Sequence, residues 1–204
     1  LPYDTIVWSD VKKSGKTALG AAIAYAWART YGGEMYALAN SKEHAQDRAF
    51  MRVVMFLDWM KKANRPRYEE LVGETPTAFS LLLKEPFARF EAIPCEAGSQ
   101  AGAYVSLSLW DELWAYKHEA ANRLWAEFSP IPQLFGRSIR LVVTYAGYFG
   151  ESQLLWDLYE STVKPSTDDA NQGTGNKVPG LEDLPAYVSD DGRTFAYWSH
   201  GPEY

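Results

Sequence analysis

The chain has 204 residues, of which 47% are hydrophobic and 23% charged, as in a folded globular domain. Its net charge of −6 argues against a surface that is positively charged throughout and binds nucleic acid in this way. No apolar run reaches the roughly 18 residues of a membrane span. One cysteine, Cys95, excludes an internal disulfide, and three scattered histidines (His44, His118 and His200) do not suggest a metal centre. A reducing, cytoplasmic setting is expected.

The first predicted elements are a strand, a loop and a helix. Residues 6–8 (IVW) predict a buried strand, and residues 18–28 (ALGAAIAYAWA) predict an alanine-rich helix. Between them, residues 10–17 read DVKKSGKT, which matches the phosphate-binding loop G-x-x-x-x-G-K-[ST] except that Asp10 replaces its first glycine. A strand, such a loop and a helix N-terminus form an anion site, because backbone N–H groups and the helix dipole face the anion.

The loop keeps the residue types that contact phosphate. Gly15 lets the backbone approach closely, Lys16 can reach the β- and γ-phosphates, and the Thr17 hydroxyl can bind Mg²⁺. A chance G-K-T in an ordinary strand–turn–helix with a surface lysine is the alternative. The predicted nucleotide-binding residues are Ser14, Gly15, Lys16, Thr17 and Ala18.

A strand and a longer helix follow. Residues 34–39 (EMYALA) predict the strand, and Asn40 or Ser41 caps a helix that runs to about Lys62. Its apolar residues recur at three- and four-residue steps and so share one face. They are Ala45, Ala49, Val53, Leu57 and Met60. The basic residues in 61–67 (KKANRPR) could contact DNA phosphates, but we favour a solvated helix end, because basic residues commonly finish helices.

The next clear strand ends in an acidic pair. Residues 90–93 predict a short strand, residues 104–110 (YVSLSLW) a second one, and residues 114–128 a helix. Asp111 and Glu112 directly follow the second strand, as in a Walker B motif, where the first carboxylate holds Mg²⁺ and the second activates water. The alternative is a solvated acidic pair at a helix start. Because a GKT loop lies upstream, we favour Walker B, and the glutamate favours hydrolysis over phosphate transfer to a metabolite.

A third strand–helix unit places a small hydroxyl residue at a strand end. Residues 139–144 (IRLVVT) predict the strand and residues 151–163 the helix. Thr144 then lies at the carboxyl edge of the sheet, where ligands of open α/β sheets bind. A plain strand-to-helix turn with its bend at Gly147 is the alternative.

The composition changes after this helix. Residues 164–204 begin with a polar stretch rich in turn formers, which predicts a linker. Residues 186–188 and 194–198 then flank an Asp-Gly pair, a strong hairpin signal. We expect residues 1–163 to form one domain, and the rest to be a linker and β-hairpin leading towards a further domain that this chain lacks.

The alternation of strands and helices predicts an α/β fold with a mostly parallel central sheet and helices on both faces. With the loop and the acidic pair, this is a P-loop NTPase, of the kind with a catalytic glutamate after the Walker B aspartate.

Four blocks in this order resemble the N-terminal ATPase domain of large terminase subunits, the motors that pump DNA into the capsids of tailed phages and related viruses. They are SDVKKSGKTALGAA, YALANSKEHAQDRAF, IPCEAGSQAGAYVSLSLWDELWAY and LVVTYAGY, and the resemblance covers residues 1 to about 162. In this family basic residues precede S-G-K-T, and the first glycine of the loop is often missing. The resemblance therefore implies a Mg²⁺-dependent ATPase.

The resemblance also implies roles for single residues. Lys16 would bind the β- and γ-phosphates, Thr17 and Asp111 would hold Mg²⁺, and Glu112 would be the base that activates water. Lys12 or Lys13 would stand for the basic residue that family members use near the γ-phosphate. Thr144 and its neighbours would couple nucleotide state to domain movement. The predicted coupling residues are Thr144, Tyr145, Ala146 and Gly147.

A ring ATPase also needs a positive charge on the γ-phosphate, often from a neighbouring subunit. The candidates near the motifs are Arg89, Arg123, Arg137 and Arg140. We choose Arg123 as the arginine acting in trans, although an ordinary surface arginine would fit as well.

By resemblance, the cofactors are ATP and Mg²⁺. The partners are double-stranded DNA, copies of the chain in a ring (a pentamer by family resemblance), the portal protein and the small terminase subunit, with no membrane. The setting is the host cytoplasm and, transiently, the viral procapsid. Two features depart from the family. Nine residues precede Asp10, where terminases carry an adenine-contacting segment, and a C-terminal nuclease is missing, so we expect no nuclease activity.

Other functions remain open at this point. A P-loop small-molecule kinase is disfavoured by the glutamate of the acidic pair and by the lack of an evident lid. A helicase would need a second motor domain. A nucleotide-binding assembly module with little activity in isolation is the non-catalytic alternative.

Overall fold

The computed structural model describes most of the chain. The described residues are 2–39, 48–94, 104–117, 119–134, 137–148, 150–163 and 175–200. Cys95, His44, His118 and the predicted helix cap at Asn40 or Ser41 lie outside them.

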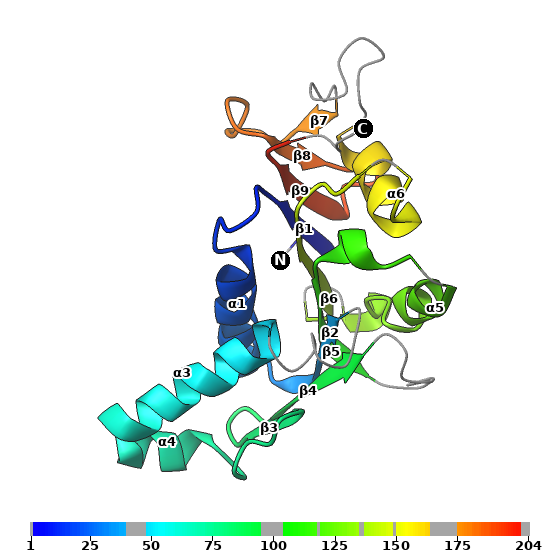
Figure 1. Ribbon diagram of the computed structural model, residues 1–204. Coiled ribbons are helices and arrows are strands. Elements are labelled where there is room, and N and C mark those ends of the chain that lie inside the picture. Colours follow the sequence, from blue (N-terminus) through cyan, green and yellow to red (C-terminus); the bar gives the residue numbers. More distant parts are fainter. Residues whose placement is uncertain are drawn as a thin grey trace.

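The described strands form one sheet. They are β1 (Thr5–Ser9), β2 (Gly33–Ala39), β3 (Ser80–Leu83), β4 (Ala88–Pro94), β5 (Val105–Asp111), β6 (Ile139–Thr144), β7 (Asn176–Lys177), β8 (Ala186–Val188) and β9 (Thr194–Trp198). Their order is β3-β4-β2-β5-β6-β1-β9-β8-β7 (Figure 1). Neighbours from β4 to β9 in this order pair in parallel, whereas β3, β7 and β8 pair antiparallel at the two edges. The predicted mostly parallel sheet is confirmed.

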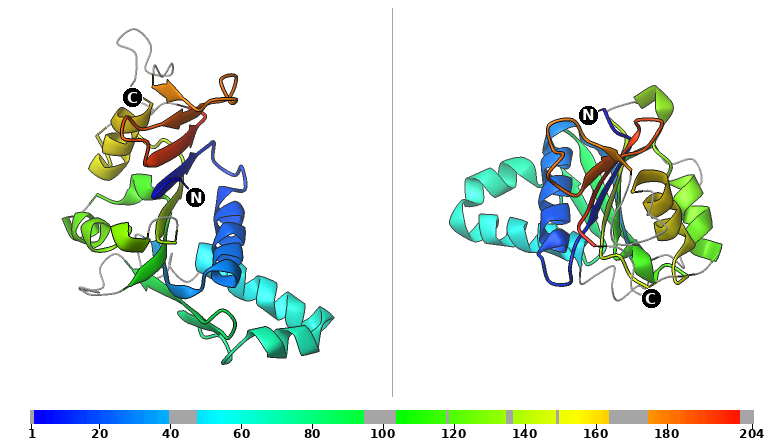
Figure 2. Two further views of the ribbon diagram at one scale, coloured as in Figure 1. Left: turned by 180° about the vertical axis from the view of Figure 1, so that it is seen from behind. Right: turned by 90° about the horizontal axis from the view of Figure 1, so that it is seen from above.

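Helices cover both faces of the sheet, as predicted. On one side lie α1 (Lys16–Thr30), α3 (Ala49–Ala63) and α4 (Arg65–Leu71), and on the other lie α5 (Glu119–Glu127) and α6 (Gln153–Thr162) (Figure 2). Two short 3₁₀ turns are η1 (Leu113–Ala115) and η2 (Pro132–Leu134). Among the described helices, none has the length and apolar character to cross a membrane.

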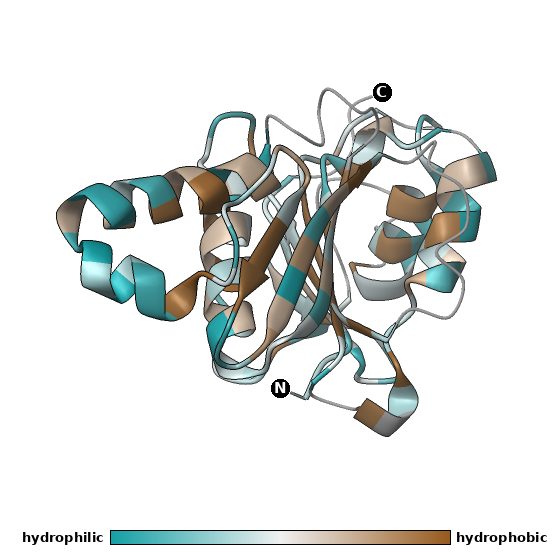
Figure 3. Ribbon diagram, turned by 90° about the horizontal axis from the view of Figure 1, so that it is seen from below, coloured by the Kyte–Doolittle hydropathy of each residue, from teal (hydrophilic) through white to brown (hydrophobic). Residues whose placement is uncertain are grey.

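Each face of the sheet has its own apolar core. Phe50, Leu57 and Leu107 belong to the core under α1 and α3, while Trp110 and Tyr159 belong to the core under α5 and α6. Every residue of β5 and β6 is buried, as expected for central parallel strands covered on both sides. Figure 3 shows the sheet between the helices, with α3 and α4 projecting from it. The two layers hold the carboxyl ends of β1, β5 and β6 at one edge.

One expectation about local structure is wrong, and the basic stretch contains the start of a further helix that was not foreseen. The helix predicted for residues 114–128 starts later, at Glu119, because the chain makes the η1 turn first and Tyr116 then has an extended backbone. Part of the basic stretch is itself a helix, α4. Asn64 caps it by accepting a hydrogen bond from the backbone N–H of Arg67, and a proline stands in its first turn.

The C-terminal hairpin is confirmed, but its place in the fold was not foreseen. β8 and β9 pair antiparallel, and Gly192 in their turn has φ 71°. β9 also pairs in parallel with β1 along its whole length, so the hairpin extends the main sheet. Ala196 and Trp198 are buried in the core under α6. Residues 186–198 are therefore joined to the sheet that carries the loop, although the sequence placed them outside the first domain.

Candidate nucleotide-binding site

The loop after β1 leaves the start of α1 open. Gly15 has φ 88° and precedes the first helical residue, Lys16, with no side-chain cap on the helix. A Cβ added to Gly15 would meet no atom within 4 Å, so the left-handed backbone, and not crowding, favours glycine there. Ser14 and Ala18 are exposed beside it. The first N–H groups of the helix are thus available to an anion, as in phosphate-binding loops.

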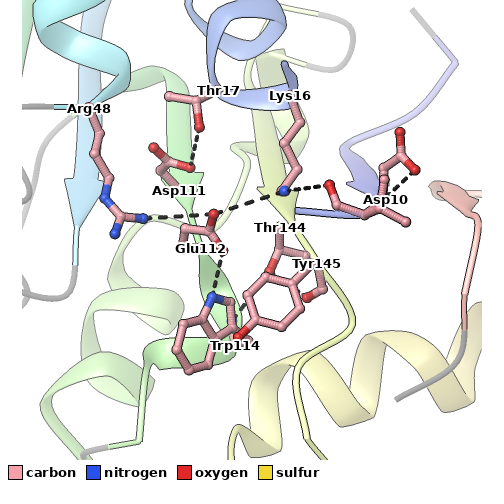
Figure 4. A network of polar contacts seen from close by, with 10 residues as sticks. Asp10, Lys16, Thr17, Arg48, Asp111, Glu112, Trp114, Thr144 and Tyr145 are labelled. Atoms are coloured by element: carbon pink, nitrogen blue, oxygen red, sulfur yellow. Dashed lines mark hydrogen bonds and ion pairs between the residues drawn. The ribbon is translucent and has the colours of Figure 1, made fainter. Parts of the chain in front are cut away.

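The Lys16 ammonium is buried at the centre of the site. The side chain is 4% exposed, and Nζ donates to the Val11 carbonyl at 3.1 Å. Nζ also lies 4.0 Å from Glu112 Oε1 (Figure 4). A buried cation between a loop carbonyl and a carboxylate is placed to receive phosphate oxygens.

Thr17 and Asp111 meet as the sequence predicts for Mg²⁺ ligands. The Thr17 hydroxyl donates to Asp111 Oδ1 at 3.2 Å, although 94 positions separate the two residues. Asp111 is 3% exposed, and its buried Oδ2 has no hydrogen-bond partner among the described residues. Burial raises the pKa of Asp111 to about 6; the Glu112 charge also raises it, whereas Arg48, the Thr17 hydrogen bond and Lys16 lower it. A buried, partnerless carboxylate oxygen beside a hydroxyl fits a divalent cation that retains several waters.

No group of three or more His, Cys, Asp or Glu that could hold a metal occurs among the described residues. This agrees with the donor set above, since Mg²⁺ is commonly bound by one or two protein ligands together with phosphates and water.

The Glu112 carboxylate is held at both oxygens. Oε1 lies 4.0 Å from the Lys16 ammonium and 3.9 Å from Arg48 Nη1, and Oε2 accepts a hydrogen bond of 2.5 Å from the Trp114 indole. The backbone of Glu112 is left-handed, with φ 59°, which is uncommon for a residue other than glycine. Its N–H donates to the Val143 carbonyl at 2.8 Å, so β6 fixes this turn. Backbone strain at such a position is typical of functional sites.

Arg48 was not among the arginines that the sequence singled out. It lies directly before α3, is 32% exposed, and brings a guanidinium to Glu112. Its position after β2 puts it at the same sheet edge as the acidic pair. A basic residue between the neighbouring parallel strand and the next described helix is a signal that could have pointed to it.

The segment after β6 touches the acidic pair through Trp114. Thr144 is fully buried, and its hydroxyl accepts a hydrogen bond of 3.4 Å from the Trp114 backbone N–H. Tyr145 lies against the Trp114 ring, with 4.8 Å between centroids. Gly147 has φ 70°, as the predicted bend requires. The predicted coupling segment, residues 144–147, therefore adjoins the candidate base.

Asp10, which replaces the first glycine of the loop, ties the loop to β9. Its Oδ1 accepts hydrogen bonds of 2.8 Å from the Val11 N–H and 2.9 Å from the Ser199 hydroxyl. The Ser199 N–H also donates to the Ser9 carbonyl at 3.0 Å. The pKa of Asp10 is lowered, because these bonds, with smaller effects of Ser14 and Lys16, outweigh the effect of burial. The aspartate thus stabilises the loop with its side chain where a glycine would allow a tight turn.

The remaining basic candidates have other surroundings. Lys12 Nζ lies 4.4 Å from the Tyr145 ring centroid, and Lys13 is exposed with φ 67°. Arg140 is buried, with its guanidinium over the Trp125 ring, so it is a core residue. Arg123 is exposed on α5 and pairs with Glu119, and its role in trans stays a prediction.

The other basic residues lie on the surface. Arg89 pairs with Glu91, and Arg137 is exposed. In the basic stretch Lys62 pairs with Asp58, and exposed ion pairs likewise link Arg65 to Glu69 and Arg67 to Glu70, as expected for solvated helix ends.

A loop with the sequence pattern of a phosphate-binding loop lies between a strand and a helix, at the carboxyl edge of a mostly parallel sheet, and this arrangement is the fold of a P-loop NTPase. The crystal structure of the HK97 bacteriophage large terminase is similar, with a TM-score of 0.57 and 19% sequence identity over 77% of this chain. The chain spans 32% of that structure's length, and at this identity the similarity establishes a common fold. No protein-family model and no curated protein matches the chain.

Proposed function

We propose that this chain is the ATPase domain of a large terminase subunit, which hydrolyses ATP with Mg²⁺ to drive DNA into a viral procapsid. The observation that carries the proposal is the meeting of Lys16, Thr17, Asp111 and Glu112 at one sheet edge. Two segments far apart in the sequence supply these residues: the start of α1 and the end of β5 with the residue that follows it. The fold shared with the HK97 large terminase, together with the four sequence blocks in family order, supports a packaging motor over other P-loop enzymes.

The geometry suggests how the residues divide the work. The open N–H groups of the loop and the Lys16 ammonium bind the β- and γ-phosphates. Thr17 and Asp111 would hold Mg²⁺, which would neutralise charge on the phosphate oxygens. Glu112 takes a proton from water as the water oxygen bonds to the γ-phosphorus and the bond from phosphorus to the β–γ bridging oxygen breaks. The products are ADP and inorganic phosphate.

Arg48 adds a positive charge to this edge from the same chain. Its guanidinium lies 3.9 Å from Glu112 Oε1, on the side of the carboxylate shared with Lys16. A cation there stabilises negative charge that develops on the γ-phosphate. The arginine from a neighbouring subunit, the ring of copies, and contacts with DNA, portal protein and small subunit belong to the same proposal and rest on the resemblance.

ATP turnover of the chain and of its Glu112→Gln variant tests the proposal. We expect the variant to bind ATP with similar affinity but to lose at least about a hundredfold in turnover, because general-base catalysis contributes about 10²–10⁴. Glu160→Gln, at an exposed position of α6, is the matched control and should behave as the parent chain. Turnover in Glu112→Gln equal to the parent's would overturn the assignment of the base, and phosphate transfer to a small acceptor would favour a kinase. Measurements with and without double-stranded DNA test the motor function.

A further inference from the structure

The side chain of Trp114 lies between the acidic pair and the segment after β6. Its indole Nε1 donates to Glu112 Oε2 at 2.5 Å, and its backbone N–H donates to the Thr144 hydroxyl at 3.4 Å. Its ring lies against Tyr145 (Figure 4). One residue thus contacts both the candidate base and the segment 144–147.

The contact between Trp114 and this segment is tight at Gly147. A Cβ added there would lie 2.7 Å from Trp114 Cβ, closer than two carbon atoms can approach without movement. A residue other than glycine at this position would therefore force Trp114 or the segment itself to shift. Because of this close contact, a shift of the segment would change the contacts of Trp114 directly.

Trp114 borders a small hollow in the structure. It lines a hollow together with Ala146, Tyr148, Trp156 and Trp198, and it is partly exposed. Its indole is therefore not enclosed by close-packed core on every side, and its contacts with Glu112 and with the segment 144–147 fix where it lies.

We propose that Trp114 is the positioning residue through which the segment 144–147 sets the orientation of the Glu112 carboxylate. The inference rests on the proposed function for its catalytic meaning. The indole N–H holds one carboxylate oxygen and leaves the other, between Lys16 and Arg48, towards the phosphate loop. Movement of the segment then reaches the base by way of Trp114.

A spectroscopic test does not depend on ATP hydrolysis. The chain has eight tryptophans, and the ¹⁹F NMR signal of 5-fluorotryptophan-labelled protein that disappears in Trp114→Phe is that of Trp114. We expect this signal to shift in Glu112→Ala and in Gly147→Ala. Gly150→Ala is the matched control, because Gly150 also has a positive φ, of 79°, but an added Cβ meets no atom within 4 Å. The inference is overturned if the chemical shift of the Trp114 signal is unchanged in Glu112→Ala, or if it changes equally in both glycine variants.

A kinetic test separates positioning from a merely structural role. We expect Trp114→Phe, which keeps the ring and loses the N–H, to lower kcat about tenfold with KM within about twofold, as expected for loss of one hydrogen bond to a charged group. Trp27→Phe is the control, because it also removes a buried indole hydrogen bond, here of 2.8 Å to Ser106. Trp27 has no contact with the acidic pair in the proposed mechanism, so kcat should stay unchanged in this variant. An unchanged or raised kcat in Trp114→Phe overturns the inference. If the parent chain hydrolyses no ATP, the proposed function fails, while the NMR result still decides whether the link exists.

Discussion

Replacement of Asp111 by asparagine should stabilise the metal-free protein while abolishing ATP hydrolysis. Asp111 is buried, and burial raises its pKa from 3.8 to about 6. Above pH 6 the folded state therefore holds an ionised carboxylate in a poor environment, whereas the unfolded state ionises freely. The penalty is relieved as the pH falls from about 6 towards 4, because the folded state then takes up a proton that the unfolded state does not hold.

The size of the effect follows from the pKa difference. A rise of about two pH units corresponds to roughly 3 kcal/mol of destabilisation at pH 8, since one unit is worth about 1.4 kcal/mol. The asparagine amide still buries a polar atom at the position of Asp111 Oδ2, which has no partner in the described part of the chain, and this costs about 1 kcal/mol. Asp111→Asn should therefore raise the free energy of unfolding by about 2 kcal/mol at pH 8 and leave it nearly unchanged at pH 4.5.

Urea denaturation followed by circular dichroism, in the presence of a chelator, measures this difference at both pH values. Asp10→Asn is the control, because hydrogen bonds hold the pKa of Asp10 below its ordinary value, so that no gain in stability is expected at pH 8. A variant no more stable than the parent at pH 8, or a gain of the same size at pH 4.5, would refute the reasoning. Addition of Mg²⁺ and ATP should stabilise the parent and not Asp111→Asn.

Three further variants test other parts of the structure. Arg48→Ala should lower kcat at least about tenfold through loss of the cation beside Glu112, the proposed base, while Arg52→Ala, one turn further along α3, should leave it unchanged in the same ATPase assay. Ser199→Ala should lower the free energy of unfolding by about 1 kcal/mol in urea titrations, because it removes the hydroxyl that donates to the loop aspartate; a neutral result would mean that this bond does not hold the hairpin. Leu57→Ala should cost about 3 kcal/mol by the same measurement, because Leu57 is fully buried, whereas Met55→Ala on the exposed face should cost under about 1 kcal/mol.

The main elements of the fold could be predicted because their signals are local. The apolar runs of β1, β5 and β6 arise because helices cover both faces of the sheet. The three- and four-residue spacing in α3 arises because one face of that helix is buried. The start of α5 could not be predicted, because the backbone of Glu112 is left-handed and its N–H donates a hydrogen bond to the Val143 carbonyl of β6. Such a contact joins residues far apart in the chain, and helix propensity alone does not register it.

The two motifs of the candidate site were predicted from the sequence, but two residues that contact the acidic pair were not. The phosphate loop and the acidic pair follow from short motifs whose chemistry needs those residue types at that spacing. Arg48 was missed because its significance depends on β2 lying next to β5 in the sheet, and sequence order does not give that pairing. Trp114 was likewise taken for a residue of a helix.

The sequence by itself determined the class of fold and the residues proposed to bind phosphate and Mg²⁺, because periodicity and motif spacing are local properties of the chain. Tertiary structure decided which distant residues meet. It joined the C-terminal hairpin to β1, made Asp10 a partner of Ser199, and set Trp114 between Glu112 and Thr144. These contacts depend on strand order and on packing between layers, which no local pattern specifies.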